Sequence, residues 1–474
     1  MIRVKSRQKT EYGDFQTPMV LAEAVCRLLS ADGVRPGSVV EPTCGQGTFL
    51  EAAGNTFPDC QRLVGREWNR AYVAEARKRL AISGCEVDLA QADFFEQDWT
   101  SLLRRQPGPL LVLGNPPWVT NSALGTLGSV NLPTKSNFQN ERGLSAKTGK
   151  ANFDISQWMI LRLLEAMPQQ DSTLAMLCKT TVGRKVLEQA WKAGLPLTGC
   201  SIRKIDSREH FDASVDACLL VCHMQAAAPT VTCEVYEDFD ADQPSTVLGL
   251  HSGNLVADQT ALKRQNHLLA TQPTTRWRSG VKHDCRDVMQ LVRQGTHFVN
   301  GLGETIDLEP DYVYPLMPAG AIYRGEVKGT EKFLIVPQTR TGEDTAPIES
   351  AAPRTWAYLQ RHANRLADRK SSIYRGRPPF SIFGIGEYSF AKWKVAISAL
   401  HKQLAFRVVG PQAGRPVMLD DTTYFLSYRT KKEAVAAAAR LNSSDVQEFF
   451  NAWIFWDAKR PITADILQRL RAAD

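Results

Sequence analysis

Short apolar segments alternate with helix-compatible stretches through the first 120 residues of the chain. Four of these segments end in a polar or acidic residue, and they cover residues 38–41, 62–67, 87–93 and 110–115. Their last residues are 26, 26 and 22 positions apart, which is the length of one strand–helix repeat. The pattern therefore predicts a parallel sheet with crossover helices, the clearest of them at residues 70–82.

The alternation continues further along the chain. It predicts a helix at residues 155–166 and strands at 173–178, 217–223 and 231–236, after a long polar connection at 121–152. From residues 271–278 onward the pattern changes to Gly- and aromatic-rich strand pieces and basic amphipathic helices. We therefore expect two domains, an α/β domain over residues 1–270 and an α+β domain over residues 271–474.

Polar side chains stand at the ends of the first four predicted strands. They are Glu41, Glu67, Asp93 and Asn115. The carboxyl ends of parallel strands meet at one edge of the sheet, where open α/β sheets bind their ligands. We expect all four side chains to project into one crevice.

A glycine-containing turn, Glu41-Pro-Thr-Cys-Gly-Gln-Gly47, follows the first strand. Gly45 and Gly47 allow the backbone to turn tightly and to approach a ligand closely. The third glycine of a dinucleotide fingerprint is absent, so this motif alone is weak. Glu67 ends the next strand 20 residues after Gly47, where a carboxylate can accept hydrogen bonds from both hydroxyls of a ribose.

The third strand end adds a site for a purine. Asp93 offers an acceptor for an adenine amino group, and Phe94 offers an apolar face for the ring. Taken singly, each of the acids at these strand ends is more often a solvated residue. Together, in register at three strand ends, they favour an adenosine-containing cofactor.

The fourth strand ends in Gly114-Asn-Pro-Pro-Trp118. Pro116 and Pro117 lack backbone N–H groups, so the Asn115 amide oxygen and the neighbouring carbonyls form an array of acceptors. Such an array suits an exocyclic NH2, whose two hydrogens can both be donated, and Trp118 can stack on the flat heterocycle. A Pro-Pro turn with a buried tryptophan explains this sequence as well when it stands alone. Its place at the end of the fourth predicted strand favours a catalytic role.

With these motifs in this order, the chain resembles the gamma class of S-adenosylmethionine-dependent DNA N6-adenine methyltransferases. The resemblance covers the whole first domain and implies a Rossmann-like class I methyltransferase fold. Tyr12-Gly-Asp-Phe-Gln-Thr-Pro18 looks like the family's N-terminal motif, which implies that Thr17 binds the methionine carboxylate of the cofactor. The turn that begins with Glu41 and Pro42 matches the glycine motif of the cofactor site.

The resemblance implies roles for the other motifs as well. Glu67 matches the ribose acid, Asp93 and Phe94 match the adenine site, and residues 115–118 match the catalytic tetrapeptide, which usually ends in Tyr or Phe. Phe211, within Arg208-Glu-His-Phe-Asp-Ala-Ser-Val215, looks like the aromatic side chain that packs on a flipped base. Stacking of that base on Trp118 and Phe211 would offset the cost of extruding it from the duplex, roughly a few kcal/mol.

The second domain is similar to the target-recognition domains of the same family. The similarity lies in Trp277-Arg-Ser-Gly-Val-Lys282 and Asp311-Tyr-Val-Tyr-Pro-Leu316. Relatives often carry a polar Lys-Ser-Ser-Asp-type stretch just after this point. This chain has Met317-Pro-Ala-Gly-Ala321 instead, a departure from the family pattern.

The net charge is concentrated in the second domain. The chain carries +7 overall, and residues 271–474 hold 29 basic and 21 acidic side chains, or +8, which leaves −1 for residues 1–270. A localised basic surface favours a polyanion as partner, although a solvated helix face explains the charge equally well. Arg361, Arg365 and Arg369 are spaced so that a helix would align them on one face, and we expect them to contact DNA phosphates.

Composition excludes several other classes of protein. Hydrophobic residues make up 43% and charged residues 23%, as in a folded soluble protein, and no run of about 18 apolar residues predicts a membrane span. The N-terminus does not resemble a secretory signal. Ten cysteines without a CxxC pair and the absence of HExxH argue against disulfides and a metal site, and they favour a cytoplasmic protein.

We therefore expect a site-specific DNA adenine-N6 methyltransferase. It would transfer the methyl group of S-adenosylmethionine to a flipped adenine in double-stranded DNA and protect host DNA in restriction–modification. We expect a monomer, and a separately encoded restriction endonuclease is left open as a partner. No convincing nuclease site is present in the chain itself.

Three alternatives compete with this hypothesis. The first is methylation of another NH2, in RNA or on a protein glutamine, since Asn-Pro-Pro-aromatic sites serve both. The second is a non-catalytic DNA-binding specificity subunit, against which the intact cofactor and catalytic motifs argue. The third is a nicotinamide oxidoreductase, which the missing third glycine and the Asn-Pro-Pro-Trp sequence disfavour.

Overall fold

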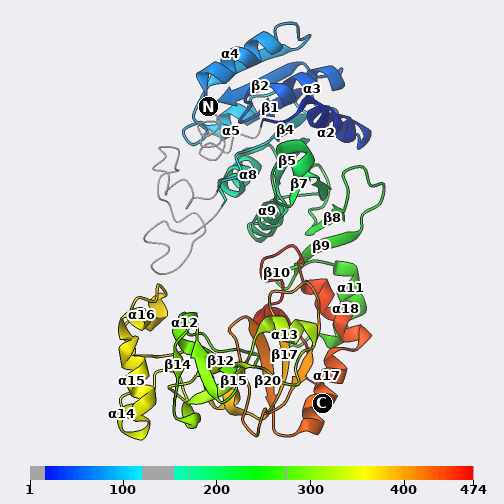
Figure 1. Ribbon diagram of the computed structural model, residues 1–474. Helices are drawn as coiled ribbons and strands as arrows, with labels where there is room; N and C mark the ends of the chain where they lie inside the picture. Colours follow the sequence, from blue (N-terminus) through cyan, green and yellow to red (C-terminus); the bar gives the residue numbers. More distant parts are fainter. Residues whose placement is uncertain (1–15, 120–153, 170, 273–274, 473–474) are drawn as a thin grey trace. The chain divides into compact units, whose positions relative to one another are not determined.

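The chain folds into two compact units in a computed structural model that describes residues 16–119, 154–169, 171–272 and 275–472 (Figure 1). The first unit comprises Met1–Gln259 and the second Thr260–Asp474. The predicted connection at 121–152 lies outside the described residues. The division falls before the predicted boundary at 270, because the intervening residues pack on the second unit: Arg264 pairs with Glu448, and Leu269 forms a β-bridge with Leu470.

The first unit is built on a ten-stranded sheet with the order β10-β9-β8-β6-β7-β5-β4-β1-β2-β3. The five adjacent strands β3, β2, β1, β4 and β5 run parallel to one another, whereas β7 runs antiparallel to β5 and β6. The strands are β1 Ser38–Glu41, β2 Arg62–Glu67, β3 Glu86–Gln91, β4 Leu110–Gly114, β5 Ser172–Lys179, β6 Gly199–Ile205, β7 Ala217–Met224, β8 Thr232–Tyr236, β9 Thr246–His251 and β10 Asn254–Val256. This confirms the predicted α/β fold with a mostly parallel sheet.

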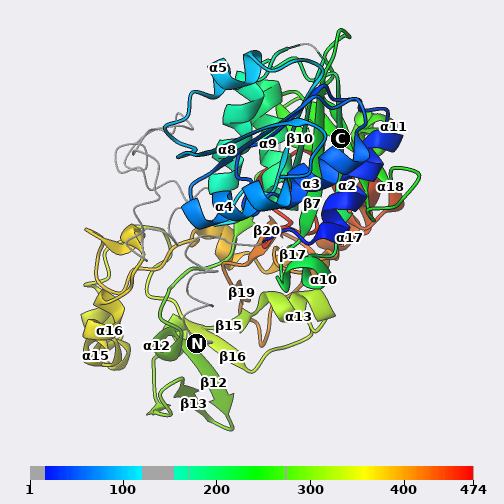
Figure 2. The same ribbon diagram turned by 90° about the horizontal axis from the view of Figure 1, so that it is seen from above.

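Helices cover both faces of this sheet, as Figures 1 and 2 show. One face packs on α2 and α3, and the other on α5, α8 and α9, each over its own apolar core. The helices of the first unit are α2 Met19–Ala31, α3 Thr48–Thr56, α4 Arg70–Arg79, α5 Trp99–Arg104, α8 Ile155–Ala166, α9 Thr180–Lys192 and α10 Ser207–Phe211, and α11 Gln259–Arg264 spans the division. Because both faces are covered, the central strands β1 and β4 are fully buried, which explains their nearly continuous apolar sequences.

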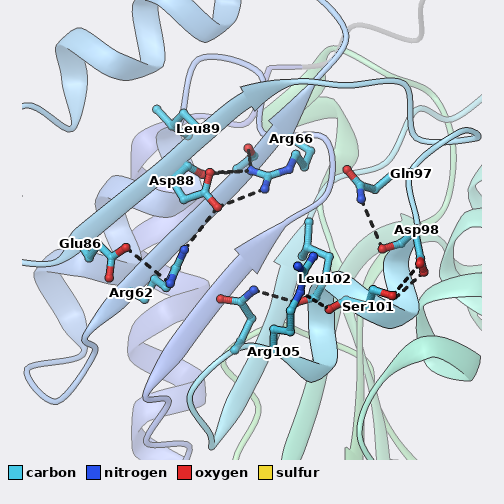
Figure 3. Close-up of polar contacts among 12 residues, drawn as sticks. Arg62, Arg66, Glu86, Asp88, Leu89, Gln97, Asp98, Ser101, Leu102 and Arg105 are labelled. Atoms are coloured by element: carbon cyan, nitrogen blue, oxygen red, sulfur yellow. Dashed lines mark hydrogen bonds and ion pairs between the residues drawn. The ribbon is translucent and has the colours of Figure 1, made fainter.

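Ion pairs join the outer strands β2 and β3 (Figure 3). Arg66 pairs with Asp88 at 3.1 Å, and Arg62 lies 3.5 Å from the same carboxylate and 3.4 Å from Glu86. The two strands are in parallel register, with Arg62 opposite Glu86, so charges of opposite sign alternate across the pair. The arginines hold the pKa of the Asp88 carboxyl below its usual value, against the effect of burial, which is the largest and raises it.

The second unit contains two mostly antiparallel sheets. Their orders are β11-β20-β17-β18 and β14-β13-β12-β16-β15-β19. The strands are β11 Arg278–Ser279, β12 Gln290–Gln294, β13 His297–Asn300, β14 Thr305–Ile306, β15 Val313–Met317, β16 Lys332–Ile335, β17 Trp393–Ser398, β18 Arg407–Val409, β19 Met418–Leu419 and β20 Thr423–Tyr428. This is the α+β arrangement that the sequence predicts.

Short helices complete the second unit. They are α12 Arg286–Met289, α13 Ala319–Arg324, α14 Ile348–Ala351, α15 Pro353–Arg361, α16 Ala363–Ala367, α17 Lys431–Leu441, α18 Ser444–Trp453 and α19 Ala464–Leu467, with 3-10 turns η1 Asn266–Leu268, η2 Pro310–Tyr312, η3 Ser372–Tyr374 and η4 Glu387–Phe390. The longest of them, α17, begins with a capping box in which Thr430 and Glu433 bond each other's backbone N–H groups.

Candidate functional site

The strand order brings the predicted site residues to one edge of the first unit's sheet. Glu41 and Glu67 are the last residues of β1 and β2, Asn115 directly follows β4, and Asp93 follows β3 by two residues. Since β3, β2, β1 and β4 are neighbours and parallel, their carboxyl ends lie side by side. The predicted crevice edge is therefore formed by the residues that the sequence singles out.

Two glycines shape the turn between β1 and α3. Gly45 and Gly47 both have positive φ, +49° and +81°, which side chains disfavour. A Cβ on Gly45 would lie 2.8 Å from the Gln16 side-chain oxygen, and one on Gly47 would lie 3.1 Å from the Ala76 Cβ. The Gly45 N–H donates to Glu67 Oε2 at 2.9 Å, so the turn is tied to the neighbouring strand. The glycines are required by the backbone and by its close neighbours.

The Glu67 carboxylate is oriented by the main chain. Its second oxygen, Oε1, accepts a hydrogen bond from the Asn69 N–H at 2.7 Å. Each oxygen thus receives one backbone donor and keeps further lone-pair capacity. Trp68, which sequence reasoning missed, follows Glu67 directly, and half of its side-chain surface is exposed. The position of a tryptophan directly after a strand-end acid is the feature of the sequence that could have pointed to it.

Glu41 is a buried acid. Only 4% of its surface is exposed, and its Oε2 has no hydrogen-bond partner among the described residues. Burial raises the pKa of this carboxyl well above its ordinary value, and the nearby charge of Glu67 raises it further, against the Leu50 N–H. A buried carboxyl oxygen without a partner is costly unless a cation or a donor compensates for it.

The residues after β3 fulfil the sequence expectation only in part. Asp93 lies at the sheet edge, where its Oδ1 accepts a hydrogen bond from the Phe95 N–H at 2.8 Å. Phe94 instead packs into the core, 7% exposed, with its ring centroid 4.8 Å from Trp99 and 6.0 Å from Trp158. The apolar face that the sequence predicts at Phe94 is thus already covered by aromatic neighbours.

Asn115 contacts the segment that precedes α2. Its side-chain Nδ2 donates to the Thr17 hydroxyl, with 3.3 Å between the two atoms. Thr17 lies immediately before Pro18, the N-cap of α2. The remainder of the predicted N-terminal motif, residues 12–15, lies outside the described residues. Two motifs 98 residues apart in the sequence are therefore in direct contact.

Trp118 and Phe211 lie against each other. Their ring centroids are 5.1 Å apart at 70°, an edge-to-face contact, and each residue is only 6% exposed. Trp118 is held further by its Nε1, which donates to the Leu177 carbonyl at 3.3 Å. The resemblance implies that both rings pack on a flipped base, and this role stays a prediction. In the structure the two rings pack on each other and are largely covered.

The predicted arginine-bearing helix of the second unit is not continuous. Arg361 ends α15, Arg365 lies in α16, and Arg369 follows both. The Arg369 guanidinium donates to the carbonyls of Leu366, His283 and Ser381 and stacks on Tyr374 at 3.7 Å. The expected alignment on one helix face is therefore wrong, and Arg369 stabilises the fold. Arg361 and Arg365 remain exposed.

The Trp277-Arg-Ser-Gly motif forms one wall of a pocket in the second unit. Trp277 is buried, 5.8 Å from the Phe406 ring, and a Cβ on Gly280 would lie 2.0 Å from the Asp420 carbonyl oxygen. Between them, Arg278 stacks on Tyr388 at 4.4 Å. The pocket has a volume of about 480 Å³ and is lined by Thr275, Arg276, Trp277, Arg278, Ser279, Tyr388 and Gln468. No carboxylate is among these residues, so the pocket suits an anion.

Comparison with known proteins identifies the family. The chain is 42% identical over 471 residues to the type II methyltransferase M.NspV from Nostoc sp., a match that covers 99% of this chain and 98% of that protein. The chain belongs to the type II methyltransferases. A second type II methyltransferase, M.XamI from Xanthomonas campestris pv. amaranthicola, is 31% identical over 114 residues, 24% of this chain and 21% of that protein. No family model matches the sequence.

A solved structure extends the likeness in fold to the whole methyltransferase. The type IIL restriction-modification enzyme MmeI, solved in complex with DNA, superposes with a TM-score of 0.53 and 12% identity, over 99% of this chain and 67% of that chain. The fold is a Rossmann-like class I methyltransferase domain followed by an α+β domain. Within the described part of the methyltransferase, every helix is too short or too polar to cross a membrane.

Proposed function

We propose that this methyltransferase transfers the methyl group of S-adenosylmethionine to the N6 nitrogen of a flipped adenine in double-stranded DNA, as the modification enzyme of a restriction–modification system. The observation that carries the proposal is the position of Asn115. Its amide lies at the carboxyl end of β4, with the strand-end acids of β1 and β2 on one side and the Trp118–Phe211 pair nearby. The family membership supports a methyl-transfer reaction at that edge.

The residues at the edge fit the cofactor in charge and shape. Glu41 has a buried oxygen without a partner among the described residues, and the ammonium group of the cofactor's methionine end would compensate for it. Glu67 is oriented by two backbone donors, so its remaining lone pairs can accept the ribose hydroxyls. Asp93 and the exposed ring of Trp68 stand beside them as partners for the adenine. When bound, the cofactor supplies an activated methyl group on its sulfonium.

The catalytic role of the chain is to present acceptors to the target amine. The Asn115 amide donates through its Nδ2 to the Thr17 hydroxyl, and its carbonyl oxygen is the acceptor that we propose for the target amine. Hydrogen bonds from an adenine NH2 to this oxygen and to the Pro116 carbonyl would favour a more tetrahedral nitrogen with an available lone pair. Catalysis is then mainly positioning and electrostatic stabilisation, without a covalent enzyme intermediate.

The second unit is proposed to bind the duplex. Arg361 and Arg365 are exposed, and the pocket beside β11 adds Arg276 and Arg278 without a neighbouring carboxylate in its lining. Guanidinium groups of this kind suit phosphodiesters, and their contribution to binding weakens as salt rises. The solved complex of MmeI with DNA, a protein of the same fold, is consistent with such a partner.

The test is a direct search for the methylated product. The purified chain is incubated with S-adenosylmethionine carrying a labelled methyl group and with duplex DNA of mixed sequence, and the DNA is digested to nucleosides for mass spectrometry. We expect N6-methyladenine with the wild-type protein and far less of it with Asn115→Ala. Label in another DNA base, in RNA or in protein would reject the assignment to adenine.

A further inference from the structure

Lys179 reaches from the end of β5 to the main chain that follows β4. The two strands are parallel neighbours, with Gly114 opposite Met176, so Lys179 stands at the same carboxyl edge as the Asn115 motif. Its Nζ donates to the Trp118 carbonyl oxygen at 3.1 Å. The Nζ also donates to Asp154 Oδ2 at 2.6 Å. One ammonium group therefore joins the predicted catalytic turn to a carboxylate.

Asp154 is itself fixed at the start of α8. Its Oδ1 accepts hydrogen bonds from the Ser156 N–H at 3.2 Å and from the Ser156 hydroxyl at 2.6 Å. The next residue, Ile155, donates its N–H to the Val119 carbonyl at 3.0 Å. Two successive carbonyls are thus held in place. Lys179 donates to the carbonyl of Trp118, and the first turn of α8 donates to the carbonyl of Val119.

The pair is largely withdrawn from water. The exposed fraction of the side chain is 9% for Asp154 and 21% for Lys179. Desolvating two charges opposes folding, so such a pair is weak evidence for stability and raises the question of another role. Its bond to Trp118 is charge-assisted and therefore stronger than one between neutral groups. The indole N–H of Trp118 also donates a hydrogen bond, to the carbonyl of Leu177, which lies in β5 like Lys179.

We propose that Lys179 is a positioning residue for methyl transfer. Its ammonium, oriented by Asp154, fixes the main chain at Trp118 and so the turn that carries Asn115. The end of β5 then holds Trp118 at two points, the carbonyl and the indole N–H, while Phe211 contacts the ring. This inference rests on the proposed function, both for the catalytic role of the Asn115 turn and for the identity of the methyl acceptor. A misplacement of about 1 Å in such a turn costs on the order of 10²-fold in rate.

Single-turnover kinetics with four variants test the role. Lys179→Met removes the donor, Lys179→Arg keeps a charged donor, and Asp154→Asn removes the orienting charge. We expect Lys179→Met to lower the methyl-transfer rate constant about 10- to 100-fold, with the affinities for S-adenosylmethionine and for the acceptor changed less than about 2-fold. Lys179→Arg should retain most of the rate. Lys192→Met is the control, because Lys192 pairs with Glu188 on α9 at a distance of 2.6 Å and lies away from the turn.

The double variant Lys179→Met with Asp154→Asn separates positioning from simple stability. If Lys179 only neutralises a buried carboxylate, the double variant should recover both the melting temperature and the rate. Under the positioning role, the melting temperature recovers but the rate does not, because the Trp118 carbonyl still lacks its donor. A double variant that transfers methyl groups at the wild-type rate would overturn the proposal, as would a Lys179→Met effect confined to KM. Each variant's rate is compared with the wild-type rate on the acceptor that the protein modifies. An acceptor other than adenine would therefore contradict the proposed function and leave this test of Lys179 intact.

Discussion

The side-chain amide of Asn115 donates to the hydroxyl of Thr17 across 3.3 Å, and this bond joins the two sites that the sequence predicts separately. The resemblance implies that Thr17 binds the methionine carboxylate of the cofactor, and Asn115 is proposed to accept the amine of the target. A hydrogen bond between them means that a change at one residue alters the orientation of the other. Cofactor binding and catalysis should therefore be coupled through this pair.

Thr17→Val tests this coupling, because it removes the hydroxyl and keeps the shape. One hydrogen bond contributes about 0.5–1.5 kcal/mol, so we expect S-adenosylmethionine affinity to fall roughly 2- to 13-fold. We also expect a slower methyl-transfer step at saturating cofactor, since the Asn115 amide loses its acceptor. Calorimetry and single-turnover assays measure the two effects, and Thr17→Ser should restore both. A normal rate at saturating cofactor would mean that the two sites are independent.

Asn115→Ala should affect chemistry far more than binding. Removal of one preorganised electrostatic partner typically costs about 10²–10³ in rate, and we expect a loss of this size in single-turnover methylation. S-adenosylmethionine affinity should change little, because the amide oxygen is proposed to serve the target amine. Trp118→Phe should retain more activity than Trp118→Ala, since it keeps a ring against Phe211. If Asn115→Ala methylates DNA at the wild-type rate, the catalytic assignment fails.

Cofactor binding should release protons from Glu41. Burial raises the pKa of this carboxyl in the protein alone, and a bound ammonium group would favour its ionised form. Affinity for S-adenosylmethionine should therefore rise with pH in the interval between the ordinary carboxyl pKa and the raised pKa of Glu41. Within this interval the group must lose a proton on binding. Below it the carboxyl stays protonated in both states, and above it the group is already ionised.

Calorimetry in two buffers of different ionisation enthalpy measures this release directly. Between the ordinary carboxyl pKa and the raised one, the apparent heats should differ for the wild-type protein and agree for Glu41→Gln. Glu23→Gln is the control, because Glu23 lies on α2 in an exposed pair with Arg27. Equal wild-type heats in both buffers throughout this range would contradict a proton-linked role for Glu41.

Lys394 should destabilise the second unit near neutral pH. It lies in β17, 1% exposed, with its Nζ donating to the Ala391 carbonyl at 2.6 Å, and burial lowers its pKa to about 7. The unfolded chain binds a proton at its ordinary, higher pKa. Stability is therefore lost as pH falls from about 10 toward 7, and the loss is complete below the folded pKa.

Lys394→Met should consequently raise the melting temperature at pH 7, by about 2–4 °C for each kcal/mol of penalty that it removes. The gain should shrink as the pH rises toward the ordinary lysine pKa of 10.5, above which neither state is mostly charged. The exposed neighbour Lys392, changed to Met, serves as the control. Thermal unfolding at both pH values gives the answer, and a gain that grows with pH would have the wrong sign for this explanation.

The ends of β1 and β4 could be predicted from the sequence because these two strands are buried on both faces. Such strands appear as nearly continuous apolar runs, and the first polar residue then marks the carboxyl edge. Glu41 and Glu67 end their strands as predicted, and Asn115 follows β4 directly. The order of the apolar segments and the lengths of the connections between them were enough to predict that these residues lie at one edge of the sheet.

The contacts that the sequence did not predict depend on tertiary neighbours. Phe94 follows an acid at a strand end, but Trp99 and Trp158 bury its ring. Lys179 gains its partners from residues 25 and 61 positions away, which no local pattern connects. Spacing alone could not show where a helix ends either, and the break between α15 and α16 removes Arg369 from the face it was predicted to share.

The break between α15 and α16 separates the roles of arginines for which the sequence predicts a single role. Arg361 and Arg365 are exposed, so Arg361→Gln with Arg365→Gln should weaken binding to cognate and random duplexes alike. The slope of log affinity against log salt should fall by roughly 0.9 for each phosphate that the variant no longer binds. Arg324→Gln is the control, because Arg324 is neutralised by Glu326 at 2.7 Å.

Arg369→Gln should act on stability instead. Its guanidinium holds three carbonyls from separate segments and stacks on Tyr374, so its loss leaves buried acceptors without a donor, at about 1–3 kcal/mol each. We expect a lower melting temperature, and, below that temperature, a salt slope equal to that of the wild type. Cofactor affinity should stay unchanged in all these variants, because the proposed cofactor site lies in the first unit. A reduced slope for Arg369→Gln, with normal stability, would mean that this arginine contacts phosphate after all and that its internal bonds are dispensable.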